Sequence, residues 1–166
     1  MRTIIYIITL FLSFNTFSQS TFEYEFDENV TLNIPEESEE GDLEGNPVVK
    51  GAIGSDIFVF TKTHKASSKV SSSDEAGLLI FFQGIKDGMI KTSKGELISE
   101  QMTTIGNEKA FNFTFSFMLK KDKKVVENFI FFYKDITYTM QFMTSEKQSA
   151  KFKTVRNEIL ESVTFN

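Results

Sequence analysis

The sequence contains no cysteine and no tryptophan, and only one histidine and two prolines occur among its 166 residues. Without cysteine the chain cannot form disulfides, thiolate nucleophiles, zinc–thiolate sites or iron–sulfur clusters, and it lacks the acylated cysteine of a bacterial lipoprotein. With His64 as its single histidine it cannot build a multi-histidine metal centre either. We therefore expect no metal site and no cofactor.

Excess positive charge is also missing. The chain carries 18 basic and 23 acidic residues, a net charge of -5, and no cluster of basic residues offsets it. A nucleic-acid backbone would be repelled, so nucleic acid is not an expected partner. Hydrophobic residues make up 40% of the chain and charged residues 25%, which is enough to bury a core in one domain.

The N-terminus has the features of a secretory signal peptide. Arg2 precedes an apolar run over 4–12, and the small residues Thr16 and Ser18 suit the positions before a cleavage site at Gln19. The run is about half of the ~20 residues that a membrane-spanning helix needs, and a retained anchor is the alternative. We expect residues 1–18 to be removed and 19–166 to form a single exported domain, periplasmic or extracellular, with no membrane span.

The first part of the mature chain alternates like strands. Phe22, Tyr24 and Phe26 share one face over 21–26, and a second strand over 30–34 ends at Pro35. The acidic stretch 36–47 is predicted to be an exposed loop, and 57–61 a buried strand.

A helix is predicted over 72–94. Ser72 and Glu75 have the spacing of a capping box, and Gly95 is expected to end the helix. The continuous apolar run 78–82 also fits a buried strand, but the length of the segment and its cap favour a helix. The helix contains three glycines that lower its stability, and we expect them to mark close packing against another element: Gly77, Gly84 and Gly88.

The rest of the chain is predicted to be a meander of strands over 97–105, 110–119, 125–133 and 136–142, followed by a helix over 146–162. The strand over 125–133 is apolar on both faces, so it should be central and covered on both sides. The final helix carries an apolar stripe of Phe152, Val155, Ile159 and Val163. The fold class is therefore α+β: a mainly antiparallel sheet of about six strands, covered by helices on both faces as an α/β/α sandwich.

The order of elements and several local sequences resemble the PsbP-like family, which includes an extrinsic photosystem II subunit and exported bacterial relatives. The resemblance covers nearly the whole mature chain but contains no site motif. It rests on five places: Ile34 with Pro35, 95–100, Ile105 with Gly106 leading into 111–117, the strand pair over 133–142, and 159–165. It implies an antiparallel sheet between helices and, for many members, a non-enzymatic accessory role. The chain has only one histidine and no long N-terminal extension, so no photosystem role or metal ligand is carried over.

Two polar segments are candidates for functional sites. The acidic residues over 36–44 lack the spacing of a calcium-binding loop, which favours a solvated loop. His64 lies near several serines, but the segment lacks the rigid Gly-x-Ser-x-Gly turn that hydrolase nucleophiles need. We expect a surface histidine, no catalytic residue and no enzyme.

The 19 phenylalanines are the most distinctive feature of the composition. They either fill the cores on both sides of the sheet or leave an apolar pocket between helix and sheet. The candidate pocket residues are Leu78, Phe81, Phe82, Ile85, Met89, Met140 and Phe142.

Three functions follow as hypotheses. The first is an exported accessory or assembly protein that binds a protein partner at the cell envelope. The alternative is a carrier of a small hydrophobic molecule in the pocket between helix and sheet, and the third is a hydrolase that uses His64.

Overall fold

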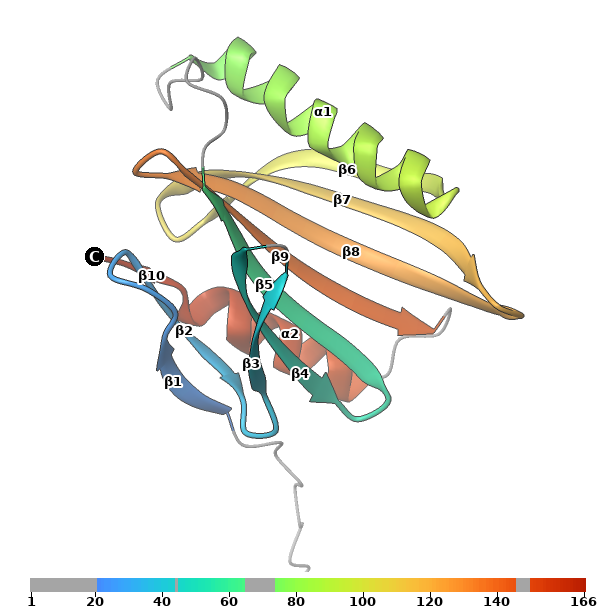
Figure 1. Cartoon of the computed structure of the whole chain (residues 1–166), viewed down its shortest axis with the longest axis horizontal. Helices are drawn as coiled ribbons and strands as arrows, with labels where there is room; N and C mark the ends of the chain where they lie inside the picture. The colour runs from blue at the N-terminus through green and yellow to red at the C-terminus, as the bar shows by residue number, and fades with distance from the viewer. Residues whose placement is uncertain (1–20, 44, 65–73, 146–149) are drawn as a thin grey trace, which may run out of the picture.

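The computed structural model describes residues 21–43, 45–64, 74–145 and 150–166 (Figure 1). The predicted signal peptide, its cleavage site and Ser72 lie outside the described residues. Within the described residues the chain forms two helices and ten strands: β1 (Thr21–Glu25), β2 (Val30–Pro35), β3 (Glu39–Leu43), β4 (Asn46–Ile53), β5 (Asp56–His64), α1 (Glu75–Ser93), β6 (Glu96–Ile105), β7 (Glu108–Leu119), β8 (Asp122–Tyr133), β9 (Ile136–Ser145), α2 (Ala150–Ser162) and β10 (Thr164–Phe165).

Seven strands form one large antiparallel sheet in the order β3-β4-β5-β9-β8-β7-β6. The strand predicted to be central, β8, lies between β7 and β9. Its odd-numbered residues face one side of the sheet and its even-numbered residues face the other, and both Phe131 and Ile130 are fully buried. The prediction of a double-sided strand is confirmed.

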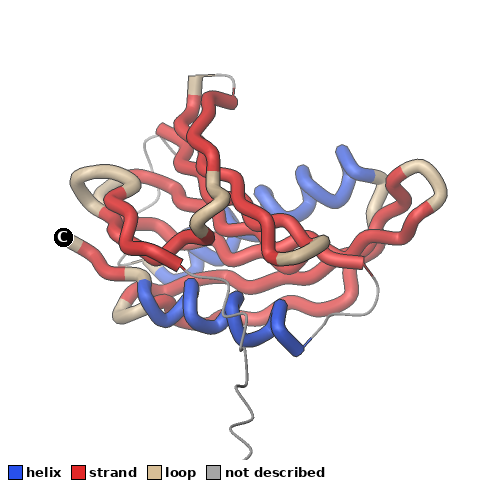
Figure 2. The backbone as a smooth tube through the Cα atoms, turned by 90° about the horizontal axis from the view of Figure 1, so that it is seen from below, coloured by secondary structure: helices blue, strands red, loops and turns tan. Residues whose placement is uncertain are grey.

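The two faces of the large sheet carry two separate cores, and the helices lie on opposite sides of the sheet (Figure 2). On one face, α1 packs through Leu78 and Phe82 on the aromatic side chains of β7 and β8. On the other face, three residues of the predicted stripe lie on α2 and Val163 directly follows it; all four are buried: Phe152, Val155, Ile159 and Val163. The apolar period of α2 thus corresponds to the face that it buries.

A second, three-stranded sheet in the order β1-β2-β10 shares the α2 face. Its Val30, Leu32 and Ile34 belong to the same core as α2. At the turn after β1, the Asp27 carboxylate accepts hydrogen bonds from Lys62 of β5 at 2.7 Å and Tyr138 of β9 at 2.9 Å. This contact joins the small sheet to the large one.

The sheet differs from the prediction in two respects. Residues 36–47, predicted to be a loop, contain β3 and the start of β4, and β4 as a whole was missed. The side chains of β3 are all exposed, so its strand structure comes from backbone pairing with β4, which hydropathy does not report. The large sheet therefore has seven strands rather than about six. The α+β class and the mainly antiparallel sheet are confirmed, but a helix and a second sheet together cover the α2 face.

Candidate functional site

Residues next to α1 in the sequence cap both ends of the helix. Asp74 is the N-cap, and its side chain accepts a hydrogen bond from the backbone N–H of Gly77. At the other end Lys94, not the predicted Gly95, adopts the left-handed conformation with φ of 54°. Gly95 has a different constraint, because a Cβ there would lie 2.7 Å from the Phe115 ring. The helix prediction is confirmed over 75–93, whereas the residue that ends the helix was misassigned.

Two ion pairs connect α1 to the neighbouring strands β6 and β7 of the large sheet. Lys86, only 8% exposed, donates to Glu100 of β6 at 2.5 Å. The hydrogen bond that Lys86 donates to Glu100 raises the pKa of Lys86 in spite of the opposing effect of burial. Near the start of the helix, Glu75 pairs with Lys109 of β7, and this contact lowers the pKa of Glu75. Both partners lie on the β6–β7 side of the helix, so that side of α1 is anchored by charge.

On its other side α1 borders a groove over the sheet. One part has a volume of about 520 Å³ and lies between α1 and β3, β4, β5 and β9. A second part, of about 460 Å³, continues toward the end of the helix. Both parts share Ile85, Met89 and Gln141, so we treat them as one surface, the α1 groove. Its lining residues are Leu43, Asn46, Val59, Thr61, Thr63, Phe81, Gly84, Ile85, Gly88, Met89, Thr92, Ser93, Phe115, Thr137, Thr139 and Gln141.

The floor of the α1 groove is polar. Gln141 is held by a 3.0 Å hydrogen bond to Oδ1 of the fully buried Asn128, and it contacts the Met89 sulfur at 3.8 Å. The Thr61 hydroxyl donates to the Pro47 carbonyl at 2.9 Å. The Thr137 hydroxyl, in contrast, is buried and has no hydrogen-bond partner. A polar atom of the floor is thus left unsatisfied.

The glycines of α1 do not have the predicted role. A Cβ added at Gly84 or Gly88 would meet no atom within 4 Å, so neither residue marks close packing. Both line the α1 groove instead. Gly77 is close only to Asp74, the cap of its own helix. The prediction of close helix packing was wrong. A sequence shows that glycine lacks a side chain, but it does not show whether another element packs against that position.

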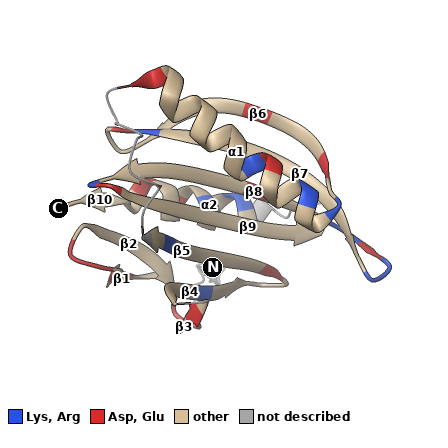
Figure 3. Cartoon of the chain, turned by 45° about the horizontal axis from the view of Figure 1, so that its top comes forward, with Lys and Arg blue, Asp and Glu red and all other residues tan. Residues whose placement is uncertain are grey.

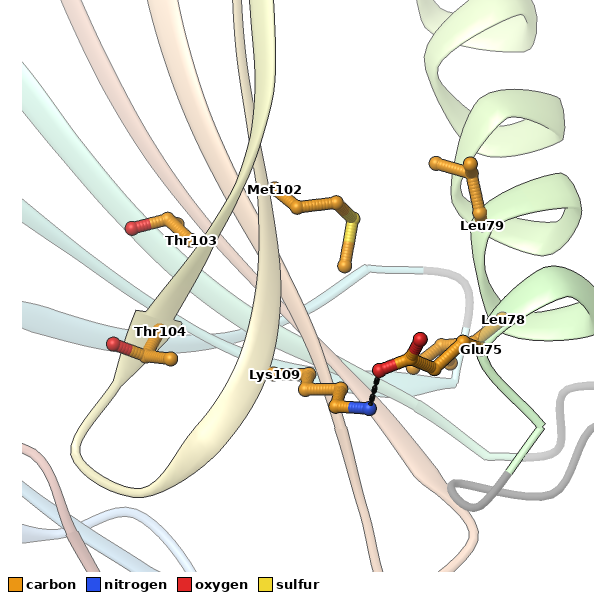
Figure 4. Close-up of a pocket in the computed structure, with 7 residues that line it drawn as sticks. All are labelled: Glu75, Leu78, Leu79, Met102, Thr103, Thr104 and Lys109. Carbon is orange, nitrogen blue, oxygen red and sulfur yellow. Dashed lines mark hydrogen bonds and ion pairs between the residues drawn. The ribbon is translucent and has the colours of Figure 1, made fainter.

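A second cleft, of about 500 Å³, lies on the β6 side of α1 (Figure 4). Leu79 and Met102 face each other across it, and the ion pair between Glu75 and Lys109 lies at one end. This cleft therefore contains charged side chains, whereas the described lining of the α1 groove contains none.

Beyond this cleft, β6 forms the free edge of the large sheet. It is ten residues long, and all of its residues except the half-buried Thr103 and the buried Ile105 are exposed. Three apolar side chains on it are markedly exposed: Leu97 at 44%, Ile98 at 57% and Met102 at 44%. The strand also has a bulge between Leu97 and Ser99.

The structure brings together some of the seven predicted pocket residues. Phe81, Ile85 and Met89 line the α1 groove, while Leu78 and Phe82 are buried beneath the helix. Met140 and Phe142 lie on the opposite face of the sheet, in the core with α2. This corrects the prediction. Alternation along β9 separated its two faces correctly, but it did not show which helix covers which face.

Sequence reasoning missed the polar floor of the groove. Thr137, Thr139 and Gln141 alternate along β9 with the predicted pocket residues, so the signal was present as the other face of the same strand. Gly84 and Gly88 are conspicuous in the sequence, but a missing side chain in a helix predicts close packing rather than a groove.

The remaining predicted features lie elsewhere. The acidic residues Glu39, Glu40 and Asp42 are exposed on β3, and no group of three or more potential ligands among the described residues is placed to hold a metal ion. His64 ends β5, and the serines after it, over 65–73, lie outside the described residues. Neither described helix combines the length and apolarity that crossing a bilayer requires.

No protein-family model and no curated protein matches the sequence. Solved structures do match the fold. Cyanobacterial PsbP from Synechocystis superimposes with a TM-score of 0.63 at 11% identity, over 89% of this chain and 94% of that one. LpqN of Mycobacterium tuberculosis, described as involved in cell envelope biogenesis, gives 0.52 at 11% identity, over 89% and 91%.

A protein from Bacteroides thetaiotaomicron gives a TM-score of 0.53 at 16% identity. The superposition covers 82% of this chain but only 45% of the length of that protein. The fold thus defines an α+β domain built on an antiparallel sheet. It is the PsbP-like fold, as the resemblance in the sequence implies.

Proposed function

We propose that the protein is an exported, non-enzymatic accessory or assembly factor that binds a protein partner at the cell envelope through the edge of β6. Export rests on the predicted signal peptide at 1–18. The accessory role is supported by analogy of fold with PsbP and with LpqN, the latter described as acting in envelope biogenesis. The site itself is argued from β6.

The two edges of the large sheet differ in how they are protected. The edge strand β3 has only five residues and carries Glu39, Glu40 and Asp42, a short acidic edge of the kind that discourages strand addition. The opposite edge, β6, is twice as long and exposes Ile98 and Met102. Over the described ranges, no strand lies next to its outer backbone groups.

An extended segment of a partner protein fits this edge. By strand addition, the backbone of the partner segment would pair with the backbone of β6. The alternating apolar side chains of the partner segment would then cover the exposed apolar side chains of β6. The exposed Met102 lies on the α1 face of the sheet, opposite Phe111 of β7. The partner segment therefore carries apolar residues rather than a charged motif.

Site-specific photocrosslinking in the native host tests this proposal. A photoreactive residue replaces Ile98 in the full chain, and a matched probe replaces Ile80, which is 70% exposed on α1. We expect one discrete protein to crosslink from position 98 and not from position 80. Met102→Lys should reduce that product at least fivefold, whereas Met118→Lys, at a 60% exposed site off the edge, should not.

Three results would overturn the proposal. They are equal products from positions 80 and 98, no discrete product from position 98, or products containing only second copies of this chain. The last result would make β6 a self-association edge.

A further inference from the structure

The α1 groove combines features that a packing defect does not explain. It runs beside a helix that is anchored on its other side, and each of its two parts falls in the ~300–1,000 Å³ range of small-molecule sites. Its character is set by three independent observations: the charge of its lining, a free hydroxyl in its floor and two glycines in its wall.

Among the residues that the structure describes, none that lines the groove is charged, although charged residues make up 25% of the chain. Figure 3 shows that β9, which supplies much of the floor, carries no charged side chain. An ionised group placed there would lose water without gaining a counter-charge, which is strongly unfavourable. The groove therefore selects an uncharged ligand.

The two sides of the groove differ in polarity. Phe81, Ile85 and Met89 of α1 form an apolar wall, while threonines of β5 and β9 form the floor. Thr137 is 4% exposed, and its hydroxyl has no hydrogen-bond partner in the described part of the chain. A buried hydroxyl without a hydrogen bond is unfavourable by about 1–3 kcal/mol. The Thr137 oxygen is covered by neighbouring atoms, so a ligand hydroxyl or carbonyl would satisfy it by displacing those atoms. The ligand therefore has one apolar and one polar part.

Gly84 and Gly88 leave space on the α1 side of the groove because they have no side chains. Each glycine in a helix costs up to ~1 kcal/mol relative to alanine, and neither Gly84 nor Gly88 has a neighbour that would exclude a methyl group. Larger side chains at these positions would project into the groove that they line. The helix thus gives up stability at the two positions where side chains would narrow the groove.

We propose that the α1 groove binds an uncharged, single-chain amphiphile. The acyl or alkyl chain lies along Phe81, Ile85 and Met89, and a hydroxyl or carbonyl of the neutral head group hydrogen-bonds to Thr137. This site is independent of the β6 edge.

Calorimetric titration of the mature protein with 1-monolauroylglycerol, below the concentration at which it aggregates, tests the proposal. Laurate at pH 8 is the matched ligand, because it has the same chain with a charged head. We expect saturable binding of the monoacylglycerol and at least tenfold weaker binding of laurate.

Two variants locate the site. Gly88→Leu fills the groove, while Ala76→Leu places the same side chain at an exposed position of α1 outside it. We expect Gly88→Leu to weaken binding at least tenfold without lowering the melting temperature, and Ala76→Leu to leave binding unchanged. Thr137→Val, which removes the free hydroxyl with little change of shape, should weaken binding about three- to tenfold.

Absence of saturable binding, equal affinity for laurate, or equal binding by the Gly88→Leu and Ala76→Leu variants would each overturn the proposal. Melting temperatures measured on the same samples separate loss of the groove from loss of the fold.

Discussion

The hydroxyl of Tyr138 donates a 2.9 Å hydrogen bond to Oδ2 of Asp27, across 111 residues of sequence. The same carboxylate accepts from Lys62 Nζ and from the backbone N–H of Asn29. Burial alone would raise the pKa of Asp27, but the hydrogen bonds from Lys62, Asn29 and Tyr138 lower it below the usual 3.8. The junction of the two sheets is therefore acid-sensitive.

Replacing Asp27 should destabilise the fold in a pH-dependent way. A lowered folded-state pKa adds stability that is complete above pH 3.8 and is lost as the pH falls through the lowered pKa. We expect Asp27→Asn to lower the free energy of unfolding by about 2–3 kcal/mol at pH 7, with a deficit that shrinks below pH 3.8. Urea unfolding followed by circular dichroism measures both. A deficit that is constant with pH would contradict this account.

Two variants serve as controls for that experiment. Asp135→Asn, at an exposed turn residue, should change stability little at either pH. Tyr138→Phe keeps the ring that stacks on Phe131 at 5.2 Å and removes only the hydroxyl, so its cost should be about 1 kcal/mol.

Alanine should act in opposite directions at different glycines of the α1 region. At Gly84 and Gly88 a methyl group meets open space, so each substitution should raise the free energy of unfolding by about 0.5–1 kcal/mol. At Gly95 the added Cβ would lie 2.7 Å from the Phe115 ring and 2.8 Å from the Ser116 carbonyl oxygen, so Gly95→Ala should destabilise. Chemical denaturation of the three variants checks the order, and a loss of stability at Gly84 or Gly88 would mean that the groove is narrower than described.

The left-handed residue at the end of α1 provides a third prediction. Lys94 has φ of 54°, a conformation that glycine adopts without strain. Lys94→Gly should therefore raise the free energy of unfolding by up to about 1 kcal/mol. Lys91→Gly makes the same change of residue inside the last helical turn and should lower stability by a similar amount. If Lys94→Gly and Lys91→Gly changed the melting temperature equally, the assignment of Lys94 as a left-handed C-cap would be wrong.

The pair between Lys86 and Glu100 should respond differently to the loss of each partner. Glu100→Gln leaves the buried Lys86 ammonium with only the exposed Asp87, at 3.4 Å, as a counter-charge and should cost about 1–2 kcal/mol at pH 7. Lys86→Met removes the buried charge and should cost less. Because the pKa of Lys86 is raised, the contribution of the pair is complete below 10.5 and is lost as the pH rises through the raised value. Denaturation at pH 7 and at pH 11 measures this, and a larger cost for Lys86→Met would refute it.

The sequence predicts best those parts of the fold in which the buried side chains give a regular spacing of apolar residues along the chain. The alternation over 111–117, the double-sided β8 and the apolar stripe of α2 all correspond to side chains that the structure buries. In each case the hydropathy of a residue reports its position directly.

The failures share a different physical origin. The edge strand β3 is held by backbone pairing while its side chains stay in water, so its sequence has the composition of a loop. Alternation separates Thr137 and Thr139 from Met140 and Phe142, but the assignment of each face to a helix depends on contacts between distant segments. The groove exists because α1 covers only part of its face, and no local pattern encodes that.

The anchoring of α1 has a mechanical consequence. In the described part of the chain, both ion pairs of the helix body with the sheet, from Glu75 and from Lys86, lie toward β6 and β7. On the groove side the polar link is the weak contact between Gln141 and the Met89 sulfur. A small roll of α1 about its tethered side would widen the groove without breaking either ion pair. The polar contacts that oppose displacement of α1 are thus concentrated on the side away from the groove, while Leu78 and Phe82 hold the helix to the sheet by apolar packing.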